Sequence, residues 1–208
     1  MSHISHYISH NSILRIAAWI VSVVFHPLNM VLLGCVFIIL LVPGITVAQL
    51  YTFCKTLLLM LFVLPLAFVP LYWLYAKLMR QEFSEKHKRL ALLFSTSVIY
   101  LFTSYNLIVH SSLTLVNTYI LACSVLMIMS FCISIFWKIS LHAIGVSGFL
   151  ALVIQLSLHA HFFAFILLPI VLVIAGLVLS SRLYLQAHTP AQVAAGFALG
   201  LCVTFCML

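Results

Sequence analysis

The chain contains no aspartate, and its only acidic residues are Glu82 and Glu85. Only 5% of its 208 residues are charged, whereas 66% are hydrophobic. A water-soluble domain carries roughly 25% charged residues, so this chain lacks the polar side chains needed to cover a globule in water. We therefore predict an integral membrane protein, folded as an all-α polytopic bundle of six or seven transmembrane spans.

The shortage of carboxylates also limits the chemistry. Hard metal ions and paired-acid hydrolysis both depend on Asp and Glu, which argues against most metal-dependent phosphatases and against glycosidase-type enzymes. The cysteines form no Cys-x-x-Cys pair and show no zinc spacing, so we interpret them as packing residues: Cys35, Cys54, Cys123, Cys132, Cys202 and Cys206. We expect no metal and no cofactor. A protein that binds haem or metal between its spans is an alternative, but most histidines lie at predicted span ends.

Apolar stretches of the length that a bilayer requires recur along the chain. After a short interfacial helix over 12–24, we predict spans at about 28–42, 52–76, 90–109, 115–136, 141–158, 162–181 and 190–207. Residues 1–76 would then form an N-terminal segment with two accessory spans, and residues 77–208 a core of five spans.

Counting spans brings the polar turns at 77–89, 137–142 and 182–189 to one membrane face. Eight of the nine Lys and Arg residues fall on this face, and only Lys55 lies near the other. The positive-inside rule makes the face cytoplasmic, although cations kept for a substrate do not follow that rule, so the side of the site stays open. We interpret the net charge of +7 through topology, anionic lipids or an anionic substrate, not through nucleic acid.

The three turns carry a set of groups suited to phosphate. Guanidinium forks match phosphate oxygens, one histidine can attack phosphorus, and a second can protonate the leaving oxygen. These residue types predict phosphoryl transfer with water as the final acceptor. The candidates are Lys86, Arg89 and Arg182 as cations, His142 and His188 as imidazoles, and Ser140 and Ser181 as hydroxyls.

Two local patterns in the last segment predict structure. Thr189-Pro-Ala-Gln192 fits a capping box for a helix that begins at Pro190, which places His188 just before a helix N-terminus, where an anion is favoured. Gly196-x-x-x-Gly200 predicts a helix-packing face, which we expect to be used within the chain.

The three turns resemble the signature of the type 2 phosphatidic acid phosphatase superfamily. Ser181-Arg182, five residues and His188 match the third motif in spacing, Ser140-Leu141-His142 resembles the second, and Lys86-x-x-Arg89 resembles a shortened first motif. The resemblance covers about residues 77–207. It implies that His188 is a nucleophile forming a phosphohistidine and that His142 is the acid. It also implies that Lys86, Arg89, Ser140 and Arg182 bind phosphate, that no metal is needed, and that the substrate is a lipid phosphate or prenyl diphosphate.

The sequence departs from the family at three places. The third-motif Asp, which orients the nucleophilic histidine, is replaced by Gln192, the second-motif Gly by Leu141, and the first-motif Pro is absent. We expect Gln192 to accept a hydrogen bond from His188 or to serve only the capping box. The alternative to an enzyme is a lipid-binding or scaffold protein of the same fold. We expect membrane lipids as partners and a bacterial inner membrane as the location, and the oligomeric state stays open.

Overall fold

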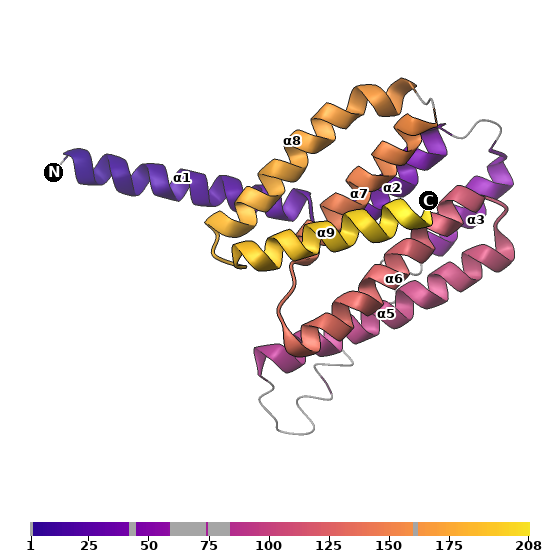
Figure 1. Ribbon diagram of the computed structural model, residues 1–208, viewed down its shortest axis with the longest axis horizontal. Helices are drawn as coiled ribbons and strands as arrows, with labels where there is room; N and C mark the ends of the chain where they lie inside the picture. The colour runs from indigo at the N-terminus through magenta and orange to yellow at the C-terminus, as the bar shows by residue number, and fades with distance from the viewer. Residues whose placement is uncertain (1, 42–44, 59–73, 75–83, 160–161) are drawn as a thin grey trace. The chain divides into compact units, whose positions relative to one another are not determined.

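The structure is a computed structural model that describes residues 2–41, 45–58, 74, 84–159 and 162–208, with side chains described from Ser12 onward. All regular secondary structure in these ranges is helical (Figure 1). The helices are α1 (Ser2–Val24), α2 (Pro27–Leu41), α3 (Val47–Leu58), α5 (Glu85–His110), α6 (Thr114–Phe136), α7 (Leu141–Leu158), α8 (Phe162–Tyr184) and α9 (Pro190–Met207). The predicted all-α class is confirmed.

Five of the described helices, α5 to α9, are long and apolar enough to cross a membrane. A sixth candidate is the pair formed by residues 12–24 of α1 and by α2, which bend by 51° at the break between them. The five helices contain all five of the spans predicted from residue 90 onward. The interfacial helix predicted over 12–24 is part of a longer α1 that begins at Ser2. Of the span predicted at 52–76, α3 covers the first part, and most of the rest lies outside the described residues.

The chain divides into two compact units. Unit 1 holds residues 1–34 and 138–206, and unit 2 holds residues 35–137 and 207–208, so α2 begins in one unit and ends in the other. The boundary predicted after residue 76 divides the chain into two consecutive segments. Each of the two observed units instead combines segments from different parts of the chain. The two units are described separately.

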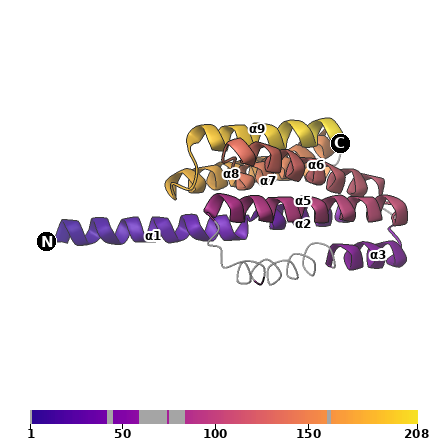
Figure 2. The same ribbon diagram turned by 90° about the horizontal axis from the view of Figure 1, so that it is seen from below.

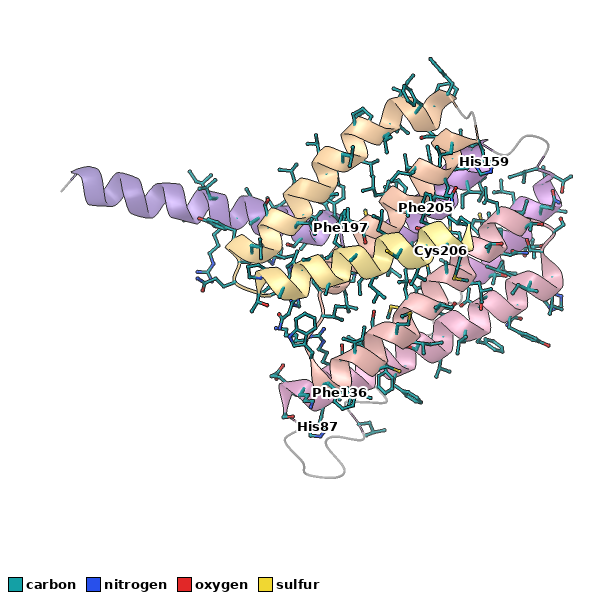
Figure 3. The ribbon with its side chains drawn as sticks, viewed as in Figure 1. His87, Phe136, His159, Phe197, Phe205 and Cys206 are labelled. Carbon is teal, nitrogen blue, oxygen red and sulfur yellow. The ribbon has the colours of Figure 1, made fainter. Side chains whose placement is uncertain are left out.

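Unit 2 is built on the antiparallel hairpin of α5 and α6. Ser84 caps the start of α5 by accepting a hydrogen bond from the backbone N–H of His87. The Ser124 hydroxyl of α6 donates to the Tyr100 carbonyl of α5 at 2.9 Å. Figure 3 shows His87, at the start of α5, and Phe136, at the end of α6, at the same end of the pair. Lys86 and Arg89 therefore lie near this end of unit 2.

Unit 1 is organised around α7, whose side chains are buried along nearly its whole length. Helix α8 runs back along α7, and the tight turn after α8 returns the chain as α9 (Figures 1 and 2). Gly196 and Gly200 of α9 face the backbone of α7 so closely that a Cβ atom at Gly196 would lie 2.7 Å from the Ser140 carbonyl oxygen. The predicted use of the Gly-x-x-x-Gly face within the chain is confirmed.

Candidate functional site

The turn between α8 and α9 places Arg182 and His188 on one short, fixed loop. Gln186 has a positive φ of 52°, the left-handed conformation that ends many helices. The Ala187 N–H donates to the Arg182 carbonyl at 3.2 Å, and the Gln186 N–H donates to the Leu183 carbonyl at 2.9 Å. This pair of bonds is the Schellman arrangement, so the end of α8 is hydrogen-bonded where the chain reverses.

The capping box predicted at the start of α9 is confirmed. The Gln192 N–H donates to the Thr189 hydroxyl at 3.3 Å, and the Thr189 N–H donates to Gln192 Oε1 at 3.1 Å. The same Oε1 atom lies 3.3 Å from His188 Nδ1. Because Oε1 only accepts, the proton of this contact is on Nδ1, and in neutral His188 the lone pair is on Nε2. Gln192 thus serves both the capping box and the histidine.

Lys138 joins the start of α7 to this turn. Its Nζ donates to the Ala187 carbonyl at 3.1 Å. Lys138, His188, Thr189 and Gln192 are among the residues that line an open cavity of about 400 Å³. A cation, an imidazole and a hydroxyl therefore share one space that is larger than a phosphate group needs.

His142 and Arg182 meet at the end of α1. His142 Nε2 lies 3.0 Å from the carbonyl oxygen of Ser22, and Arg182 donates from a terminal guanidinium nitrogen to the Ser22 hydroxyl at 3.1 Å. A carbonyl only accepts, so the His142 proton in this contact is on Nε2. The ring of His26 stands edge-on to that of His142, with centroids 5.5 Å apart.

Arg182 keeps hydrogen-bonding capacity that the described residues do not use. Its Nε atom is buried and has no hydrogen-bond partner among them. A buried guanidinium N–H that lacks a partner is costly, whereas a bound anion would satisfy it. The Nε–H is therefore an unsatisfied donor among the described residues, although it is covered from solvent and Arg182 does not line the cavity beside His188.

The two predicted serine ligands are held within the helices. The Ser140 side chain is 0% exposed, and its hydroxyl caps α7 by accepting from the Ala143 N–H at 3.4 Å. The Ser140 N–H in turn donates to the Gln192 carbonyl at 3.4 Å. The Ser181 hydroxyl, also buried, donates to the Leu177 carbonyl at 2.7 Å. In this geometry both serines hold the ends of helices, and their roles as phosphate ligands stay predictions.

Of the predicted site residues, unit 1 holds His142, His188, Gln192, Ser140, Ser181 and Arg182. Lys86 and Arg89 belong to unit 2, where Lys86 is exposed and Arg89 is partly buried on the first turns of α5. Their neighbour Lys88 forms an exposed ion pair with Glu85 at 2.7 Å. The grouping of Lys86 and Arg89 with the histidines stays a prediction.

Three residues at the site were not among the predicted ones. Ser22 and His26 come from α1 and the bend after it, which lie before the region of family resemblance, and Lys138 lies in the turn predicted at 137–142. The signal for Lys138 was its place two residues before Ser140. For Ser22 the sequence carried no signal, because its partners lie 120 and 160 positions away.

No group of three or more His, Cys, Asp or Glu side chains that could hold a metal ion occurs among the described residues. Comparisons with protein-family models, with curated proteins and with solved structures find no match to the chain. The resemblance to the phosphatase superfamily therefore rests on the three motifs alone.

Proposed function

We propose that this chain is an integral membrane lipid phosphatase that hydrolyses a phosphomonoester or diphosphate through a phosphohistidine, without a metal. The observation that carries the proposal is the His188–Gln192 contact at 3.3 Å on the turn that follows Arg182. An acceptor on Nδ1 leaves the nucleophilic lone pair of His188 on Nε2, which is the tautomer that an attack on phosphorus requires.

In the proposed reaction, the Arg182 guanidinium binds the phosphate oxygens and His188 Nε2 attacks phosphorus. The bond from phosphorus to the lipid oxygen breaks, and that oxygen takes a proton from His142. For this step His142 enters as the imidazolium: its Nε2–H faces the Ser22 carbonyl, and Nδ1–H is the proton that it would deliver. Water then attacks phosphorus, gives its proton to His142 and releases inorganic phosphate. Lys138 would add positive charge beside the cavity next to His188.

A lipid substrate suits the location of these groups on the helices. Arg182 lies in the last turn of α8, His142 at the start of α7 and His188 just before α9, and all three helices are candidate spans. A headgroup at the membrane surface would reach the cations while its acyl chains stay in the bilayer. We further propose six or seven spans in total and a bacterial inner membrane, and the side of the membrane that carries the site stays open.

The second candidate is a protein that binds lipid phosphate without hydrolysing it. Its support is the neutral amide of Gln192, since a carboxylate at this position would stabilise the imidazolium that forms when His188 becomes phosphorylated. Arg182 and Lys138 would still bind the headgroup.

Phosphate release by the purified protein separates the two. The substrates are phosphatidic acid, phosphatidylglycerol phosphate and undecaprenyl diphosphate, each with EDTA present, and His188→Ala is assayed alongside. If the protein is the proposed enzyme, phosphate release should persist in EDTA and disappear in His188→Ala. Binding of the same lipids with no release, or equal release by His188→Ala, would reject the phosphohistidine mechanism.

A further inference from the structure

In the last turn of α1 one backbone carbonyl, that of Ser22, is met by a side chain from α7. In a regular helix the N–H of His26 would bond to the Ser22 carbonyl, but it donates to the Val23 carbonyl at 3.3 Å instead. The Asn29 side chain covers the carbonyls of Val23 and Val24, at 3.3 and 2.9 Å. The remaining carbonyl, that of Ser22, accepts from His142 at 3.0 Å.

The Ser22 side chain contacts a second residue of the site, Arg182. The Ser22 hydroxyl accepts from Arg182 at 3.1 Å, and Ser22 is only 5% exposed. One residue of α1 therefore touches the candidate acid on α7 and the candidate phosphate ligand on α8.

We infer that Ser22 is a positioning residue for this site: its carbonyl holds His142 Nε2–H, which leaves Nδ1 to exchange the catalytic proton, and its hydroxyl fixes the Arg182 guanidinium for phosphate. The inference rests on the proposed function for the role of His142, but the phosphate-binding part of it does not require turnover. It also extends the site to α1, which lies before the region that resembles the phosphatase family.

The hydroxyl can be removed without touching the carbonyl. Ser22→Ala should weaken the binding of inorganic phosphate about tenfold, as expected for the loss of a hydrogen bond to a charged group. In hydrolysis the same variant should raise KM by a similar factor and leave kcat nearly unchanged, because Arg182 would hold phosphate in the ground state and the transition state alike. Ser22→Thr, which retains a hydroxyl, should restore both.

Ser130→Ala is the matched control. Ser130 is fully buried, and its hydroxyl donates only to the Leu126 carbonyl of its own helix in unit 2. It should leave phosphate affinity unchanged. Affinity is read from the phosphate-dependent rise in the unfolding temperature, which needs no catalysis. If Ser22→Ala does not fold, Ser22→Cys retains nearly the same volume but only a weak acceptor, and should show the same loss.

The outcomes separate this inference from the proposed function. Weaker phosphate binding by Ser22→Ala, with rescue by Ser22→Thr, supports it even if the wild-type protein hydrolyses no lipid. Hydrolysis by the wild type with unchanged phosphate affinity and KM in Ser22→Ala would overturn the inference and leave the proposed function standing. A wild-type protein that does not bind phosphate would overturn the phosphate-binding part of this inference, whereas the proposed function is judged by phosphate release.

Discussion

The packing of α9 on α7 gives a stability prediction with an internal control. A Cβ atom at Gly196 would lie 2.7 Å from the Ser140 carbonyl oxygen and 3.2 Å from the Ala143 Cβ. At Gly200 it would meet the Ser147 hydroxyl and the Ile144 carbonyl more closely still. Three of these four atoms belong to the backbone or to the Cβ of a buried helix, so the two helices must move apart.

The magnitude follows from two opposing terms. Overpacking costs about 1–3 kcal/mol, whereas replacing Gly by Ala within a helix gains about 0.5–1 kcal/mol. Gly196→Ala should therefore lower the free energy of unfolding by about 1–2 kcal/mol, and Gly200→Ala by more. At Gly176 of α8 nothing lies within 4 Å of the added atom. Gly176→Ala should therefore raise the free energy of unfolding by about 0.5–1 kcal/mol.

Equilibrium unfolding in detergent micelles, followed by far-ultraviolet circular dichroism, measures the three variants side by side. Since the Ser140 N–H also bonds to the Gln192 carbonyl, Gly196→Ala should disturb the α8–α9 turn as well. If Gly196→Ala and Gly200→Ala prove as stable as Gly176→Ala, the close packing of α9 on α7 is wrong.

Three further predictions concern the turn, the nucleophile and the topology. Gln186→Gly should raise the free energy of unfolding by about 0.5–1 kcal/mol, because φ is 52° at this position and glycine adopts it without strain. Gln186→Ala should not raise it. A lower free energy of unfolding for Gln186→Gly would contradict the Schellman turn. Gln192→Glu, which keeps the reach to His188 and adds a charge, should raise kcat about tenfold, while a fall in kcat would argue against Gln192 as the orienting group. The third variant has His87, which is exposed, replaced by cysteine in a chain that lacks its other cysteines. This cysteine should react with an impermeant thiol reagent from the cytoplasmic side only. Labelling from the outer side would show that the predicted topology is inverted.

The helices and the local caps could be read from the sequence. Leu141–Leu158 matches its predicted span, and Pro190 and the Thr189–Gln192 pair give both the start of α9 and its capping bonds. These features depend on residues within a few positions of each other, where side-chain type and spacing decide the structure.

The contacts that complete the site could not be read in this way. The group that His142 meets is a backbone carbonyl, which every residue possesses, and it becomes available only because α1 ends beside it. Gln186 was not predicted to be left-handed, since glycine or asparagine usually marks that position. The His142 contact is decided by packing between helices that are distant along the chain, whereas the Gln186 turn is local but lacks the residue that usually marks it.

The most direct test of the central claim is to trap phosphate on His188. The purified protein is mixed with a lipid substrate carrying radioactive phosphate and is quenched in alkali within the first turnover. We predict labelled protein that is stable in alkali, loses its label in acid as a phosphohistidine does, and is absent from His188→Ala. Turnover without labelled protein, or label that persists in His188→Ala, would contradict the claim that His188 is the nucleophile.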